Sequence, residues 1–183
     1  MARRKTIPDE QVLDTLLQTL METGPAGFTF ARAAKAAGLS PATLVQRYGD
    51  GAGLLQAVLL RAWDRLDAET EEANKAAAAT PEGAIDLLMR LMPPETAEHD
   101  ATDGLLLLRE DIRDSVLRAR GAAWGHRLAT VLALRLSGDP EEGRQLAWQM
   151  MSLWQGAHTW WAFTREDTAN RAIRRVLEDW LRR

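Results

Sequence analysis

The chain has 183 residues, of which 46% are hydrophobic and 27% are charged, and its net charge is −3 at pH 7. This composition supports one or two small globular domains and excludes a disordered, charge-rich chain. The absence of cysteine excludes disulfides, thiolate metal centres and thiol catalysis, and it fits the cytoplasm, where we expect the protein. Residues 1–48 carry two more basic than acidic side chains, and residues 49–183 carry five more acidic than basic ones. Any contact with a polyanion is therefore expected near the amino terminus.

Helical periodicity runs through most of the chain, whereas the β-branched and aromatic residues that favour strands are scarce. The sequence therefore predicts an all-α protein of about nine helices. Residues that cap helices precede several of them, namely Thr6, Thr29, Ser40, Thr80 and Asp139. The polar segment 95–102 is expected to be a loop. In chain order, the expected helices span residues 8–22, 30–37, 41–48, 53–78, 81–92, 103–111, 114–136, 140–163 and 167–181.

One stretch of 20 residues, between Arg144 and Arg165, contains no Lys, Arg, Asp or Glu. Eight of these residues are Gln, Ser, Gly, His or Thr, which would be costly in a bilayer, so we expect no membrane span. A helix that is apolar on more than one face needs a second covering surface. The sequence therefore predicts that this helix and the last one pack against a second copy of the chain, as a four-helix bundle in a homodimer.

Residues 29–48 have the pattern of a helix-turn-helix. Gly38 allows the left-handed backbone of a tight turn, and the small or apolar residues Ala34, Leu39 and Leu44 are expected to pack the two short helices together. Gln can pair with adenine, Arg with guanine or phosphate, and a Thr methyl with the thymine methyl. Taken by its spacing alone, the pattern also fits a compact turn between packed helices. If it binds DNA, the outward-facing residues are Ala42, Thr43, Gln46 and Arg47, with phosphate contacts from Lys35, Arg3, Arg4 and Lys5.

The segment Gly27–Asp50, GFTFARAAKAAGLSPATLVQRYGD, resembles the DNA-binding domain of TetR-family transcriptional regulators, as do Leu54, Leu55 and Val58 after it. The resemblance covers roughly residues 8–60. It implies a repressor that binds a palindromic operator in double-stranded DNA as a homodimer and is released by a small ligand. Residues 1–52 would then form the DNA-binding domain, and residues 53–183 the effector-binding and dimerisation domain. The residues expected at the DNA are Arg4, Lys5, Thr29, Arg32, Lys35, Ser40, Pro41, Ala42, Thr43, Gln46, Arg47 and Tyr48.

Two positions depart from the family pattern. Val45 stands where an aromatic residue usually touches the phosphate backbone, and Gly51 stands where a lysine usually does. Each lost phosphate contact weakens DNA binding, because fewer counterions are released. The alternative function is therefore a helical module for small-ligand binding or protein interaction, whose degenerate helix-turn-helix binds DNA weakly.

The chain has seven tryptophans but only one tyrosine and three phenylalanines. Each indole ring is explained by core or interface packing, and some could also line a pocket for a small apolar or aromatic effector. The expected ligand-binding residues are Trp63, Leu66, Met89, Trp124, Leu128, Trp154 and His158. The expected dimer-interface residues are Trp148, Met151, Trp161, Ile173, Val176, Leu177 and Trp180.

The sequence gives no indication of a metal, a cofactor or an enzymatic activity. The three histidines lack the spacing of a helical zinc site, and the glycines at 49–53 lack the lysine of a phosphate-binding loop. A nucleophile-elbow pattern is also missing. Only a convergent cluster of catalytic side chains, which the sequence does not reveal, would make this chain an enzyme.

Overall fold

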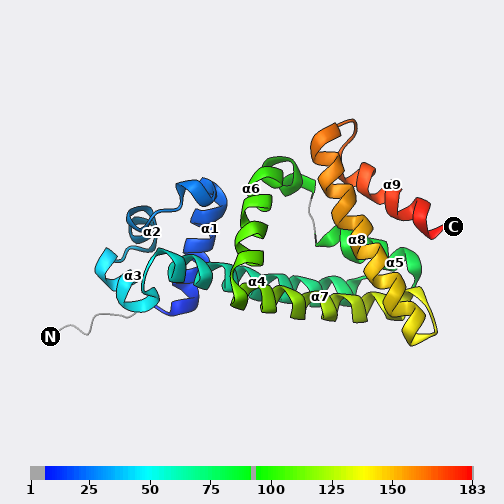
Figure 1. The fold of residues 1–183 in the computed structure, drawn as a ribbon, viewed down its shortest axis with the longest axis horizontal. Helices are drawn as coiled ribbons and strands as arrows, with labels where there is room; N and C mark the ends of the chain where they lie inside the picture. Colours follow the sequence, from blue (N-terminus) through cyan, green and yellow to red (C-terminus); the bar gives the residue numbers. More distant parts are fainter. Residues whose placement is uncertain (1–6, 92–93, 183) are drawn as a thin grey trace. The chain divides into compact units, whose positions relative to one another are not determined.

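The computed structural model describes residues 7–91 and 94–182, with only the backbone described over residues 94–103. This part of the chain forms nine helices and no strand, which confirms the predicted all-α fold (Figure 1). The helices are α1 (Asp9–Gly27), α2 (Phe30–Ala37), α3 (Pro41–Tyr48), α4 (Gly51–Ala76), α5 (Pro81–Arg90), α6 (Pro94–Arg113), α7 (Ser115–Leu136), α8 (Pro140–Thr164) and α9 (Ala169–Leu181).

Side-chain caps fix the starts of the helices that the sequence predicted best. The Thr29 side chain accepts a hydrogen bond from the Arg32 amide, and that of Ser40 accepts one from the Thr43 amide, so α2 and α3 begin and end where expected. Asp139 caps α8 in the same way, with Pro140 in the first turn. Each cap satisfies a backbone N–H that has no partner inside its helix.

The ends of α1 differ from the prediction. Pro8, and not the expected Thr6, occupies the N-cap position, without a side-chain hydrogen bond; Thr6 itself lies outside the described residues. The glycine and proline expected to stop the helix near residue 22 only kink it, because Gly24 takes a positive φ of 65° and helical turns resume to Gly27. α4 starts at Gly51 rather than Gly53, since the Asp50 carboxylate accepts a hydrogen bond from the Gly53 amide.

The loop predicted over residues 95–102 is wrong, because α6 runs without interruption from Pro94 to Arg113. The sequence of this segment is mostly polar, and the prediction treated polarity as a loop signal. Its alanines and glutamates are nevertheless good helix formers, and Pro94 is in the first turn, where its missing N–H costs nothing.

The chain divides into two compact units. The first unit comprises Met1–Arg65 and Leu106–Gly121, and the second comprises Leu66–Leu105 and Ala122–Arg183. The sequence had placed the boundary at residue 52. In the structure, the first part of α4 and the start of α7 contribute to the same unit as α1–α3.

The first unit is built around one apolar core. Leu16 of α1, Leu44 of α3 and Val58 of α4 are fully enclosed in it, and Leu117 of α7 joins them. The expected packing of Ala34 and Leu44 is confirmed, since only 4% and 0% of these residues remain exposed. Because α3 is only eight residues long, it depends on this core for its stability.

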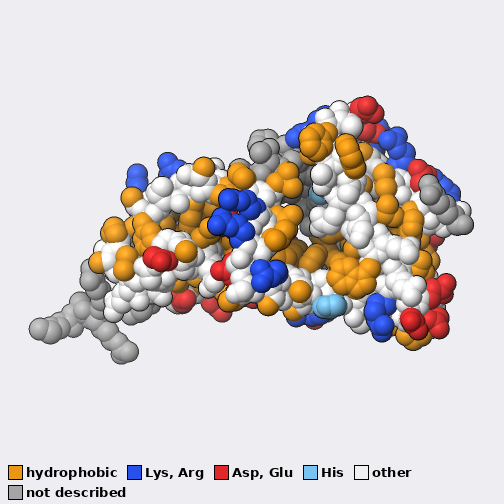
Figure 2. Space-filling model, viewed as in Figure 1, with side chains coloured by type: hydrophobic (Ala, Val, Ile, Leu, Met, Phe, Trp, Pro, Cys, Tyr) orange, Lys and Arg blue, Asp and Glu red, His pale blue; other side chains and the backbone are white. Residues whose placement is uncertain are grey.

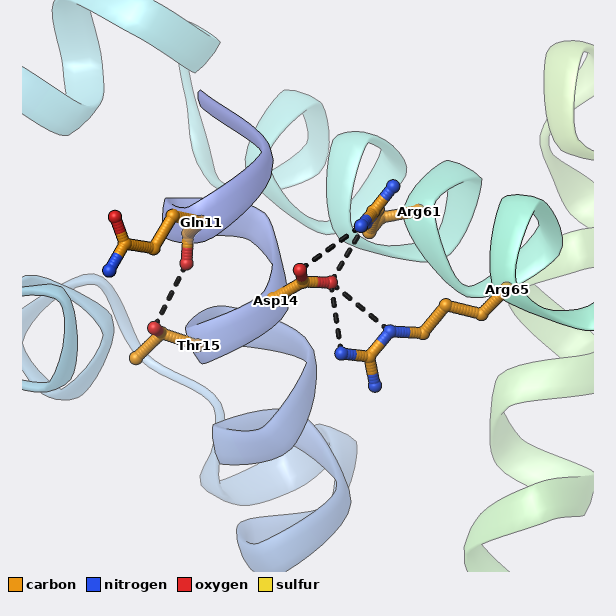
Figure 3. Close-up of polar contacts among 5 residues, drawn as sticks. All are labelled: Gln11, Asp14, Thr15, Arg61 and Arg65. Atoms are coloured by element: carbon orange, nitrogen blue, oxygen red, sulfur yellow. Dashed lines mark hydrogen bonds and ion pairs between the residues drawn. The ribbon is translucent and has the colours of Figure 1, made fainter. Parts of the chain in front are cut away.

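An ion-pair cluster joins α1 to α4 within the first unit (Figure 3). The Asp14 carboxylate accepts two hydrogen bonds from Arg61, at 2.8 and 3.0 Å, and a further one from Arg65 at 3.1 Å. The Arg61 guanidinium lowers the pKa of Asp14 below its usual value. Such two-pronged arginine–carboxylate contacts fix geometry as well as charge, so they set the position of α1 on α4.

In the second unit, α9 packs against both α8 and α5. Arg135 of α7 stabilises the carboxyl end of α4, because its guanidinium donates hydrogen bonds to the carbonyls of Asn74, Ala77 and Ala78. Among the described residues, no helix combines the length and hydropathy that crossing a membrane requires.

Replacing Asp14 by Asn tests whether the ion-pair cluster stabilises the first unit. At pH 7, we expect Asp14→Asn to lower the free energy of unfolding by about 1–2 kcal/mol, since the guanidinium groups lose a charged acceptor. The lowered pKa of Asp14 contributes stability above the ordinary carboxyl pKa and loses it as the pH falls through the folded-state value. The difference between variant and parent should therefore shrink below about pH 4.

Urea denaturation at several pH values measures this difference. Glu166→Gln, at an exposed position between α8 and α9, is the control for a carboxylate removed without loss of this cluster. An Asp14→Asn variant as stable as the parent at pH 7 would show that the cluster does not stabilise the fold.

Candidate nucleic-acid interface

The two helices α2 and α3 meet at a tight turn. Gly38 has a φ of 63°, in the left-handed region that favours glycine, and the Leu39 amide donates to the Ala34 carbonyl at 3.0 Å. Leu44 points into the core, which turns the opposite side of α3 to solvent. The turn and its packing are those of a helix-turn-helix, the arrangement that presents its second helix to a DNA groove.

Most of the predicted DNA-contacting residues lie on the solvent side of α2 and α3. Lys35, Ala42 and Gln46 are exposed, as are the capping residues Thr29 and Ser40 with Pro41. Thr43 is half-buried, and its hydroxyl shares a 2.8 Å hydrogen bond with that of Ser40. The exposed Arg32 donates to the Gly27 carbonyl at 2.8 Å. The predicted residues Arg4 and Lys5 lie outside the described part of the chain.

Arg47 does not project outward as the sequence predicted. Its guanidinium lies 3.4 Å from the Asp9 carboxylate and donates to the Ile7 carbonyl at 3.3 Å, and only 21% of its side chain is exposed. The Tyr48 hydroxyl donates to the same Asp9 oxygen at 2.7 Å. Asp9, Arg47 and Tyr48 therefore form a polar clasp between the last turn of α3 and the first turn of α1. Sequence spacing gives no sign of it, since its partners are 38 and 39 residues apart.

The clasp has a measurable electrostatic consequence. Burial, together with the hydrogen bond to Asp9 and its negative charge, raises the pKa of Tyr48 to about 12. The phenol therefore stays protonated at any physiological pH and acts as a hydrogen-bond donor there.

The two departures from the family pattern are both at the surface. Val45 is 52% exposed on α3, and Gly51 is exposed at the start of α4. A Cβ at Gly51 would only touch the Phe30 ring, at 3.9 Å, whereas one at Gly53 would collide with the Tyr48 carbonyl. Gly53 is therefore required by its surroundings, and Gly51 is not.

Six of the seven predicted ligand-binding residues belong to the second unit. Met89, Trp124, Leu128 and Trp154 are buried, and Leu66 and His158 are half-buried. The Trp124 indole donates to the Thr70 hydroxyl at 3.0 Å. Trp63 instead belongs to the first unit, where its indole donates to the Asp111 carboxylate at 3.0 Å.

The predicted dimer-interface residues fall into two groups. Met151, Trp161, Ile173 and Leu177 are buried inside the protomer. The other three retain exposed surface, namely Trp148, Val176 and Trp180.

An apolar groove follows the outer side of α8 and α9. One hollow of about 490 Å³ is lined by residues that include Gly156, Trp160 and Val176, and a neighbouring one of about 450 Å³ is lined by residues that include Trp148 and Trp180. Hydrophobic side chains show on the surface along α8 in Figure 2. Trp160 is 70% exposed but was not among the predicted interface residues, because it lies among many apolar residues of α8.

No family model matches the sequence, and no curated protein matches it either. Several solved structures, however, match the fold of this chain. A protein assigned as a transcriptional regulator of Pseudomonas aeruginosa PAO1 superposes with a TM-score of 0.73 at 15% identity, over 99% of this chain and 93% of that one. A TetR transcriptional regulator from Rhodococcus sp. RHA1 gives 0.62 at 20% identity over 93% of each chain. A TetR-family regulator from Thermus thermophilus superposes with a TM-score of 0.58 at 19% identity, over 94% of this chain and 97% of that one. The chain therefore has the fold of TetR-family regulators, as the resemblance implied.

Titration of the phenol tests the polar clasp directly, because Tyr48 is the single tyrosine of the chain. At pH 11 we expect less than roughly a tenth of Tyr48 to be ionised, whereas an ordinary phenol of pKa 10 would be about nine-tenths ionised. Asp9→Asn should move the pKa only part of the way back, since burial, the largest single cause of the shift, remains.

The phenolate absorbance after a rapid pH jump gives the ionised fraction before the chain unfolds, and urea-unfolded protein supplies the reference. The raised pKa also means that the contribution of Tyr48 to stability is complete below pH 10 and disappears as the pH rises towards 12. A native titration that coincides with the unfolded one would mean that the clasp is not formed in solution.

Proposed function

We propose that the protein is a DNA-binding transcriptional regulator that reads its operator with α3. The observation that supports this most is the helix-turn-helix geometry itself: Gln46 is exposed on α3, beside the half-buried Thr43, while Leu44 anchors the helix in the core. A glutamine amide on such a helix can pair with the adenine edge in the major groove. The structural likeness to TetR-family regulators supports the same function.

Phosphate contacts would come from the outer side of the same two helices. Lys35 is exposed on α2, and the Ser40 and Thr29 hydroxyls lie at the amino ends of α3 and α2, where backbone N–H groups favour anions. Arg47 would hold α3 against α1 through Asp9 while it remains in the polar clasp. The phosphate-binding residues near the amino terminus would be Arg4 and Lys5.

The proposed regulator acts as a homodimer, with half-sites about one helical turn, roughly 34 Å, apart on the operator. Its interface would be the apolar groove of α8 and α9, covered by the same groove of a second copy. Trp160 is 70% exposed there, and Trp148 and Val176 are 40% and 38% exposed. Solvent-exposed apolar side chains in one continuous groove are typical of a protein interface.

The proposed repressor would release DNA when a small ligand binds within the second unit, among Leu66, Met89, Trp124, Leu128, Trp154 and His158. The ligand would favour a conformation that binds DNA poorly, by its higher affinity for that conformation. Trp63 is not part of this proposed site, because it belongs to the first unit, where its indole is bonded to Asp111.

A second function is favoured by Val45 and Gly51. Both are exposed beside the predicted DNA-binding surface and neither carries a charge. The helix-turn-helix region would therefore make fewer phosphate contacts than the family pattern provides. Such a loss of phosphate contacts is expected of a helical ligand-binding or protein-interaction module whose helix-turn-helix is degenerate. The two functions differ in whether binding to the promoter beside the chain's own gene exceeds binding to random DNA.

Gln46→Ala tests direct base reading. We expect it to weaken binding to that promoter segment by about 5- to 100-fold, which corresponds to roughly 1–3 kcal/mol for a bidentate base contact, and to leave random-sequence DNA nearly unchanged. Lys35→Ala should weaken both DNAs and lower the slope of log K against log salt by about one.

Fluorescence anisotropy at matched salt measures both effects. Gln18→Ala is the matched control, because Gln18 is also an exposed glutamine of the first unit, and its amide donates to Glu22. Equal affinity of the parent for promoter and random DNA would support a degenerate helix-turn-helix. Unchanged promoter binding by Gln46→Ala would exclude α3 as the helix that reads the bases.

Trp160→Glu tests the dimer. We expect the parent chain to be dimeric at micromolar concentration and Trp160→Glu to be monomeric, since a buried carboxylate in an apolar interface has no partner. Leu134→Glu on α7 is the control, because Leu134 is 79% exposed and lies outside the groove. Sedimentation velocity gives the masses, and a monomeric parent chain would refute the interface.

A further inference from the structure

Two polar atoms on one face of α8 are enclosed and have no hydrogen-bond partner within the part of the chain that the structure describes. They are the indole N–H of Trp154 and the Nε2 atom of His158, which lie four residues apart. The two rings stack with a centroid distance of 6.5 Å and an interplanar angle of 29°. Trp154 is only 4% exposed, so water outside the protein does not reach its N–H group.

The other enclosed indoles show that this is unusual for the molecule. The N–H of Trp63 donates to Asp111, that of Trp124 to Thr70 and that of Trp161 to the Asp167 carbonyl, at 2.8–3.0 Å. A buried donor left without a partner costs about 1–3 kcal/mol, and native proteins hold few of them. The Trp154–His158 pair therefore has the properties of a site whose partner is a separate molecule.

The second copy of the chain would not supply that partner. With 3.6 residues per turn, Trp154 and His158 share a face of α8 with the buried Met151, whereas Ser152, Gly156 and the exposed Trp160 of the groove lie on the opposite face. Ala157 and Trp161 also line the groove and lie between the two faces. The exposed part of the proposed dimer interface is therefore on the other side of α8 from the Trp154–His158 pair.

The two groups define the chemistry of the missing partner. An indole N–H can only donate, so the partner must carry an acceptor such as an oxygen. Burial lowers the pKa of His158, so its imidazole is neutral and offers either an N–H or a lone pair at Nε2. A charged group would lose its hydration in such an enclosed place.

We infer that Trp154 and His158 are the polar end of the effector site, and that they bind an oxygen atom of an uncharged, mainly apolar molecule such as a phenol or an aryl alcohol. The inference rests on the proposed ligand-binding role of the second unit. It specifies a hydroxyl or carbonyl oxygen as the feature that the site recognises.

A matched pair of probes, 1-naphthol and naphthalene, tests the inference by calorimetric titration of the full chain. We expect the parent to bind 1-naphthol about tenfold more tightly than naphthalene, as one otherwise unsatisfied buried donor would give. Trp154→Phe should remove this preference and leave naphthalene binding within about twofold. Trp161→Phe, which deletes an equally buried indole N–H, should keep the preference.

Thermal denaturation without ligand is a second readout. Trp154→Phe should lower the Tm less than Trp161→Phe does, because both variants lose ring volume in the core but only Trp161→Phe also loses a hydrogen bond. If Trp154→Phe lowers the Tm as much as Trp161→Phe does, the N–H is already bonded to an internal water and the inference is wrong. Equal affinities of the parent for both probes, or binding of neither, also overturn it.

Promoter binding, measured on the same preparations, separates this inference from the proposed function. A parent that binds the promoter selectively but neither probe refutes the inference and leaves the regulator intact. A parent that prefers 1-naphthol but does not select the promoter supports the site and refutes DNA regulation.

Discussion

The orientation of the helix-turn-helix depends on two carboxylates of α1. Asp14 is bonded to Arg61 and Arg65 of α4, and Asp9 is bonded to Arg47 and Tyr48 of α3. Both carboxylates belong to one continuous helix, so α1 ties α3 to α4 through polar contacts at its surface as well as through the apolar core. Charged hydrogen bonds of this kind are directional. They restrict rotation of α3 in a way that the packing of Leu44 alone would not.

The same contacts limit the charge that α3 presents. Arg47 is neutralised by Asp9, and Val45 and Gly51 add no positive charge to the surface around it. Affinity for DNA in general comes from phosphate contacts and their released counterions. With few such contacts, a regulator of this design would depend on base contacts for a larger share of its affinity. Weak non-specific binding would therefore be consistent with a working regulator as well as with a degenerate one, and only selectivity for the promoter separates the two.

The sequence predicted best those elements whose ends are set by neighbouring residues. Thr29, Gly38 and Ser40 determine the bounds of α2 and α3 through contacts within a few residues. The second half of α6 was expected as a helix over residues 103–111, but its first half was missed because a polar sequence hides a helix whose formation depends on propensity. Arg47 was misjudged for a different reason, since its partner Asp9 is 38 residues away and no local pattern shows such a contact.

For the predicted ligand-binding and dimer-interface residues, the sequence likewise indicated which residue types matter but not where each side chain lies. Composition identified α8 as a helix with apolar residues on several faces, but it did not tell which face is covered by the protomer itself. The structure buries Met151 in the interior and exposes Trp160 in the groove, while Trp161 is buried and also lines the groove. A helix with one enclosed face and one open face can bind a small molecule on the first and a second protomer on the other. A substitution on either face of α8 should then affect one partner without directly contacting the other, which allows the two proposed roles to be separated by single side chains.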